Sequence, residues 1–142
     1  MSSTRGARGH RWLPHTADVR IEAWGRTREE CLTEAVTGVV DSFAEVAGVR
    51  PTVGGTVLLP EGPGEDLLVA VLSEVIVRVD ADGLVPVDVE VRRVPGGVEV
   101  RLAFAALDAV AIVGAAPKAV SLHRLSCAPA ARGWACSVIL DV

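Results

Sequence analysis

Carboxylates near the two ends of the chain are the first residues whose types and spacing could do chemistry. His15 and Asp18 lie three residues apart, just before an alternation of apolar and polar residues. Such a pair could hold a metal ion, or act as a base and the group that orients it. The simpler interpretation is a surface histidine beside an aspartate that caps a turn. From these residues alone we favour the simpler interpretation.

Asp141 is the second candidate, because it interrupts the apolar run Val138–Val142. The strand period places it on the same face as Ser137 and Ile139. A carboxylate on a mostly buried strand needs a cation or hydrogen-bond donors. Together with the terminal carboxylate of Val142 and a third acid such as Asp18, it would form a site for a hard cation such as calcium or magnesium. The alternative is a frayed, solvated chain end, and the spacing leaves both open.

Lys118 is the only lysine among 14 basic residues. Either the chain simply prefers arginine, or this position needs a compact ammonium on a flexible stem. Ser121 and His123 follow it, and alternation places these two on one face of a strand with Lys118 on the other. The sequence has no Gly-x-Ser-x-Gly elbow. The segment therefore indicates a strand with solvent-facing polar residues rather than a serine hydrolase.

The composition limits the classes of protein to be considered. The chain has 142 residues, of which 50% are hydrophobic, and a net charge of −4. It is too apolar for global disorder, and no apolar run reaches the ~20 residues of a membrane helix. The acidic balance argues against a stand-alone nucleic-acid binder. The three cysteines form no C-x-x-C pair, so neither a disulfide framework nor structural zinc is indicated. We expect a cytoplasmic protein with a flexible tail at residues 1–10 and a single domain at 11–142.

The elements that must position these residues begin with a strand at Val19–Trp24, where apolar and polar residues alternate. Thr27 and Glu30 then form a capping-box pattern that predicts the start of a helix. Apolar residues at helical spacing follow from residue 32 to residue 46. Gly48 is expected to end this helix.

The remaining pattern predicts a second helix and mostly antiparallel strands. The ranges are strand 52–59, helix 66–79, a hairpin of strands 85–91 and 98–104, and strands 119–125 and 135–142. The order is strand, helix, strand, helix and then four strands. It predicts an α+β fold, a two-layer sandwich of mostly antiparallel β-sheet with two α-helices.

Several short motifs, in order, resemble those of the archease family from about Trp12 to Val142. They are His15-Thr-Ala-Asp18, the capped helix from Thr27, Glu65-Asp-Leu-Leu68, Lys118-Ala-Val-Ser-Leu-His123, and the ending from Gly133-Trp134 to Leu140-Asp-Val142. The resemblance implies a small α+β accessory protein, an activator or chaperone and not an enzyme. Its partner would be the GTP-dependent RNA-splicing ligase of the RtcB type that acts in tRNA splicing. Such proteins promote guanylylation of the ligase histidine and multiple turnover.

The resemblance also implies site residues. Asp18, Asp141 and Val142 match the positions that bind a divalent cation, calcium in the first place, with magnesium or manganese as alternatives. Lys118 matches the family's lysine, and together with Asp18, Asp141 and His123 it would act on the partner. RNA would be reached only through the ligase, and no membrane is involved.

The chain departs from the family pattern at two positions. Leu122 stands where a tyrosine is usual, and Val71 where a tryptophan is usual. Two other functions stay open from the sequence. One is a general chaperone or adaptor for RNA-modifying enzymes. The other is a stand-alone metal-dependent hydrolase that uses Asp18 and Asp141, with His15 as the base.

Overall fold

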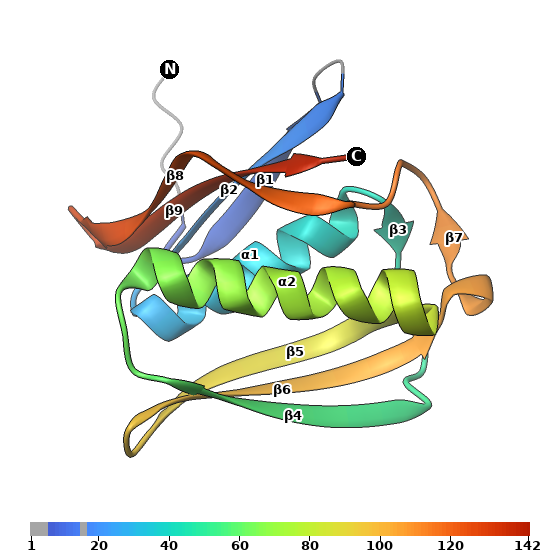
Figure 1. Cartoon of the computed structure of the whole chain (residues 1–142), viewed down its shortest axis with the longest axis horizontal. Coiled ribbons are helices and arrows are strands. Elements are labelled where there is room, and N and C mark those ends of the chain that lie inside the picture. The colour runs from blue at the N-terminus through green and yellow to red at the C-terminus, as the bar shows by residue number, and fades with distance from the viewer. Residues whose placement is uncertain (1–5, 15–16) are drawn as a thin grey trace.

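Two antiparallel sheets enclose a pair of helices (Figure 1). The structure is a computed structural model that describes residues 6–14 and 17–142. Its elements, in chain order, are β1 (Gly9–Pro14), β2 (Asp18–Gly25), α1 (Arg28–Asp41), β3 (Ala44–Glu45), β4 (Val53–Pro60), α2 (Gly64–Asp82), β5 (Leu84–Val94), β6 (Gly97–Ala106), the 3₁₀ turn η1 (Leu107–Ala109), β7 (Ala111–Ile112), β8 (Ala119–Ala130) and β9 (Gly133–Asp141).

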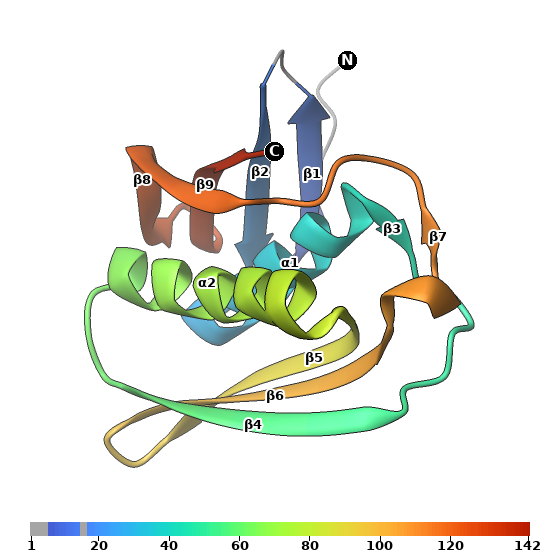
Figure 2. The ribbon, with the colours of Figure 1, turned by 45° about the vertical axis from the view of Figure 1, so that its right-hand side comes forward.

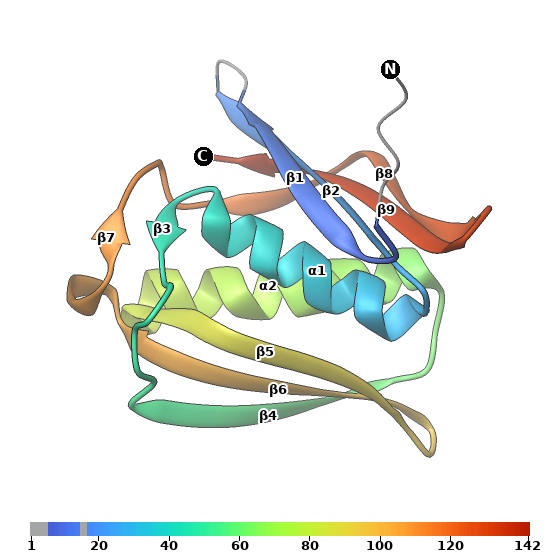
Figure 3. The ribbon, with the colours of Figure 1, turned by 180° about the vertical axis from the view of Figure 1, so that it is seen from behind.

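The first sheet has the strand order β1-β2-β9-β8, and the second has the order β4-β6-β5. The short strands β3 and β7 pair with each other beside them. Seen from the front and from behind, α1 and α2 lie between the two sheets (Figures 1 and 3). The buried apolar residues of both sheets and both helices form the core. The α+β class with antiparallel sheets is therefore confirmed, but the strands form a layer on each side of the helices instead of a single layer.

Helix α1 begins where the capping pattern predicts. The Thr27 hydroxyl accepts a hydrogen bond from the Glu30 N–H at 3.0 Å. The Glu30 carboxylate turns back and accepts from the Arg26 N–H at 3.2 Å, which closes a variant of the capping box. The expected end at Gly48 is wrong, because the helix ends at Asp41. The chain there turns into β3, which pairs with β7, and that pairing replaces further helix.

Helix α2 is longer than expected and runs from Gly64 to Asp82. Its apolar face is buried along the whole length, from Leu67 to Val79. Gly83 adopts a left-handed conformation with φ of 63° and ends the helix. A glycine is favoured there because a side chain would strain this backbone.

The predicted strands are all present, and the hairpin of β5 and β6 turns at Pro95–Gly96 as expected. Strand β1 is not among the predicted elements. Gly9 and His10 belong to this strand and pair with Trp24 and Ala23 of β2, so the tail assigned to residues 1–10 is wrong for these two. Among the described residues, no helix is both long and apolar enough to span a membrane.

Candidate metal and partner site

The acidic residues from the two ends of the chain meet at one end of the four-stranded sheet. Asp18 is the first residue of β2 and Asp141 the last of β9, and the antiparallel ladder places them directly opposite each other. On the other side of β9, Ala119 is the partner of Asp141. Figure 2 shows the start of β8 beside the C-terminal end of β9. Lys118 immediately precedes β8 and so lies at the same end of the sheet.

Main-chain hydrogen bonds fix this meeting point. The Lys118 N–H donates to the Asp141 carbonyl at 2.7 Å, and the Val142 N–H donates to the Ala17 carbonyl at 3.3 Å. Residues 141–142 are thus held between the start of β2 and the start of β8. The carboxylate of Asp141 takes no part in these two bonds and stays available on the surface.

The two carboxylates share the outer face of the sheet, away from the helices. In β9, Val138 and Leu140 are buried against the helices, and Asp141 alternates with them and is exposed. Asp18 is half-buried, and residues directly opposite in a ladder project from the same face. The period-2 prediction of Asp141's face is confirmed. The expectation that the Asp141 carboxylate is buried is wrong, because the residue is exposed to solvent.

This arrangement suits a hard divalent cation in its chemistry. Two opposed carboxylates supply the oxygen ligands that calcium and magnesium prefer, and the main-chain oxygen of Val142 follows directly. Within residues 6–14 and 17–142, no group of three or more His, Cys, Asp or Glu side chains is placed to hold a metal. A complete ligand set would therefore need main-chain oxygens or water in addition to the two aspartates. His15, the predicted base, lies outside the described residues.

His123 lies further along β8, in a bulge. Ser121 pairs with Ile139 and Ser126 with Ser137, so the four residues 122–125 stand opposite Val138 alone. Within the bulge Arg124 has a φ of 57°, and the His123 N–H donates to the Ser121 hydroxyl at 3.2 Å. His123 is exposed. It is not part of the pairing of Asp18 with Asp141, and Ser121 stabilises the bulge.

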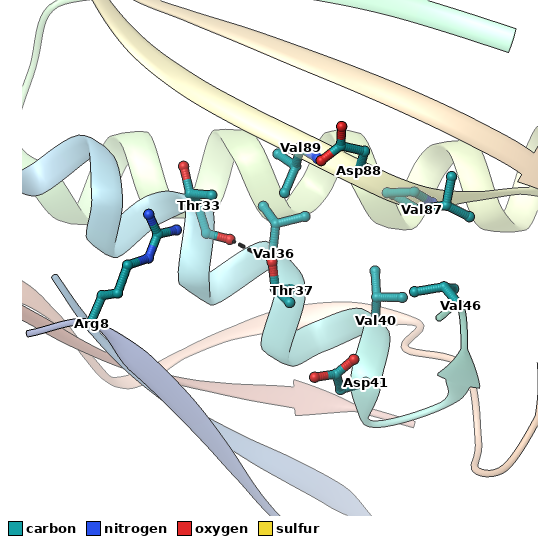
Figure 4. A pocket seen from close by; sticks show the side chains of 11 residues that line it. Arg8, Thr33, Val36, Thr37, Val40, Asp41, Val46, Val87, Asp88 and Val89 are labelled. Carbon is teal, nitrogen blue, oxygen red and sulfur yellow. Dashed lines mark hydrogen bonds between the residues drawn. The ribbon is translucent and has the colours of Figure 1, made fainter. Parts of the chain in front are cut away.

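A pocket of about 260 Å³ lies elsewhere, between α1 and β5 (Figure 4). Its polar wall is already engaged within the protein. The Thr33 hydroxyl accepts from the Val91 N–H at 3.2 Å and donates to the Glu29 carbonyl at 2.9 Å. Thr37 donates to the Thr33 carbonyl at 3.1 Å. None of the predicted site residues lines this pocket.

The same outer face also carries a charged cluster that was not predicted from the sequence. Glu22 of β2 accepts hydrogen bonds from Arg20 and from Arg11 of β1. Burial raises the pKa of Glu22, but these two arginines outweigh it and lower the pKa overall. Arg20 is thereby engaged by Glu22. The alternation of charges in residues 18–22 is the sequence signal that could have located this cluster.

Residues 10–142 match the model of the archease protein family (MTH1598/TM1083). The probable protein archease of Mycobacterium tuberculosis (strain H37Rv) is 46% identical over 134 residues, which cover 94% of this chain and 75% of that protein.

Two solved structures share the fold at 19% sequence identity. The solution structure of protein 1598 of Methanobacterium thermoautotrophicum superposes with a TM-score of 0.69 and covers 94% of this chain and 99% of that one. The crystal structure of an archease from Thermotoga maritima, described as a possible chaperone, gives a TM-score of 0.64 with both chains fully covered. The match over residues 10–142 and the 46% identity show that the chain belongs to the archease family.

Proposed function

We propose that this archease-family chain is an activator of a GTP-dependent RNA-splicing ligase of the RtcB type. It would promote guanylylation of the ligase histidine and repeated turnover through a divalent-cation site at the end of the four-stranded sheet. The observation that carries the proposal is the pairing of Asp18 with Asp141, with Lys118 bonded to the Asp141 main chain. Residues far apart in the sequence thus bring two acidic residues and one lysine to the same end of the four-stranded sheet.

Each residue has a role that its chemistry supports. Asp18 and Asp141 would hold the cation, with the main-chain oxygen of Val142 as a further ligand. The negative charge of a nucleotide triphosphate opposes its approach to a histidine nucleophile, and a bound divalent cation would offset that charge. Lys118 is exposed, and its ammonium would contact a phosphate or a carboxylate of the ligase. His123, on the neighbouring bulge, would contribute to the surface that meets the ligase.

Ligase guanylylation and multiple-turnover RNA ligation, measured with and without this protein, test the proposal. Stimulation by the wild type should be lost in Asp18→Asn and in Asp141→Asn and reduced in Lys118→Gln. Asp80→Asn is the matched control, because Asp80 is an exposed acid on α2 outside this end of the sheet. Stimulation that survives both aspartate substitutions would contradict the role of the acidic pair. Absence of any stimulation would contradict the activator function.

A general chaperone is the second candidate, since the T. maritima protein of the same fold is described as a possible chaperone. In that case the acidic pair would stabilise the fold and have no separate effect on a partner's chemistry. Asp18→Asn should then lower the melting temperature and partner binding together. Phosphoester turnover by the purified protein alone would instead point to the hydrolase function that the sequence left open.

A further inference from the structure

The three cysteines of the chain meet in the core beside the β8–β9 hairpin. Cys127 of β8 and Cys136 of β9 are directly opposite in the ladder, and Cys31 comes from the first turn of α1. All three are free thiols, with exposed fractions of 0% for Cys31, 2% for Cys127 and 5% for Cys136. The Cys31 thiol lies 3.6 Å from the Ala23 carbonyl. The thiols also interact with one another.

The ladder geometry makes Cys127 and Cys136 a pair that a disulfide can join. Pro129 has no N–H to donate, so its pair with Trp134 is a non-hydrogen-bonded pair of the ladder. Cys127 and Cys136 are two positions further along the same uninterrupted register and are therefore also a non-hydrogen-bonded pair. The Cα atoms of such pairs are about 4.5 Å apart with the side chains close. Disulfides span Cα separations of about 4.4–6.8 Å, so no backbone rearrangement is needed.

The surroundings distinguish the two sulfurs. Gly64, the first residue of α2, packs on Cys127 so closely that a Cβ there would lie 3.1 Å from the Cys127 Sγ. The first residue of α2 therefore lies in van der Waals contact with the Cys127 sulfur. Hydrogen bonds from the Cys136 and Cys31 thiols lower the pKa of Cys127 to about 4, whereas that of Cys136 is raised to about 12. The opposite directions of these two pKa shifts agree with the position of Cys127 on the edge strand β8, and both favour Cys127 as the sulfur that reacts first.

We propose that Cys127 and Cys136 are a redox-active pair that a peroxide converts to a reversible cross-strand disulfide. The Cys127 thiol gives up its proton, and its thiolate attacks one peroxide oxygen. The O–O bond breaks, the leaving hydroxide takes up a proton equivalent to the one that Cys127 released, and it departs as water, which leaves a sulfenic acid on Cys127. The Cys136 sulfur then attacks the Cys127 sulfur, its proton goes to the departing hydroxide, and a second water leaves as the S–S bond forms. Two thiols lose two electrons, and one peroxide becomes two waters. A reducing dithiol reverses the step.

The fold offers a route for the oxidant to this buried pair. Strand β8 is an edge of its sheet, and the bulge of residues 122–125 leaves it unpaired shortly before Cys127. Edge strands beside a break in the ladder are among the segments that open locally. Opening of β8 at the bulge would expose Cys127 while β9 stays paired with β2.

Thiol mapping of the intact wild-type protein tests the proposal. The reduced protein is treated with hydrogen peroxide, the peroxide is removed with catalase, and free thiols are alkylated in denaturant. Trypsin cleaves after Arg28, Arg124 and Arg132, so each cysteine falls on its own peptide. The expected result is a loss of two hydrogens, a disulfide joining peptides 125–132 and 133–142, and alkylation of Cys31 alone. Dithiothreitol should restore three alkylatable thiols.

Other outcomes overturn the proposal. These are three alkylated cysteines after peroxide, a disulfide that includes Cys31, or a sulfinic acid on Cys127 with no linked peptide. Two variants sharpen the test once circular dichroism shows that they fold. Cys31→Ser should still form the disulfide, whereas Cys136→Ser should stop at a sulfenic acid on Cys127 that dimedone traps. Because the wild-type map is decisive without them, failure of a variant to fold does not remove the test.

Discussion

Replacing Asp141 by asparagine should change the stability of the protein in opposite directions without and with calcium. Asp18 and Asp141 are directly opposite on one face of the sheet. Like charges in such a pair destabilise a sheet by about 0.2–1 kcal/mol, and the exposure of Asp141 places the cost toward the lower end. In a chelator, Asp141→Asn should therefore raise the free energy of unfolding by a few tenths of a kcal/mol. For a chain of this length that is on the order of 1 °C in melting temperature.

Calcium should reverse the order of the two proteins. At a concentration about 100 times its Kd, a ligand that binds only the native state adds about 2.7 kcal/mol to stability. The wild type should gain several degrees, and the variant, with one carboxylate left, should gain little. Thermal unfolding followed by circular dichroism in EDTA and in calcium measures both effects, with Asp80→Asn as the control. A melting temperature that responds equally to calcium in wild type and Asp141→Asn would refute the site. A variant that is less stable in EDTA would show that the carboxylate has a structural role.

Three further substitutions test the local arguments. Thr27→Ala should lower the free energy of unfolding by about 1 kcal/mol, because it removes the N-cap of α1. Thr27→Ser keeps the capping hydroxyl and should retain most of the wild-type stability. Gly64→Ala should cost about 1–3 kcal/mol, since its Cβ would lie 2.7 Å from the Cys127 carbonyl, while Gly62→Ala, with open space around it, should be nearly neutral. The pKa of Glu22 is lowered in the folded state, so its contribution is present above its ordinary value of 4.5 and is lost as the pH falls through the folded pKa. Glu22→Gln should accordingly flatten the loss of stability toward acid, as measured by urea unfolding at a series of pH values.

Periodicity and capping predicted the elements whose stability is local. The helix start at Thr27 needed only the residues within one turn, and the β5–β6 hairpin needed only alternation around a turn. The end of α1 depends on β7, some 70 residues later in the chain, and no local pattern carries that information. Strand β1 is similar, because its pairing with β2 and the contact of His10 with Glu34 and Asp41 of α1 are what order it.

For the candidate site too, local patterns predicted some features, whereas others depend on residues far apart in the sequence. That Asp141 faces outward follows from alternation, but its meeting with Asp18 depends on β2 and β9 being neighbours, which the sequence does not state. The resemblance supplied this pairing before the topology did. The meeting of the three cysteines was invisible for the same reason, because Cys31 and the hairpin are about 100 residues apart. Only the pairing of Cys127 with Cys136 could have been predicted from the sequence, because a short turn connects their two strands.

The two positions where the sequence departs from the pattern expected from the resemblance have opposite physical surroundings. Val71 is 1% exposed on the buried face of α2, so a change of size there must be absorbed by packing between the sheets. Leu122 is 71% exposed in the bulge of β8, where a side chain contacts solvent or a partner and contributes little to the core. Leucine in place of the tyrosine that the resemblance leads us to expect at position 122 would therefore change the surface beside His123 and leave the fold as it is. If the proposed ligase binds beside His123, a change at residue 122 would alter the surface that it meets without affecting the core.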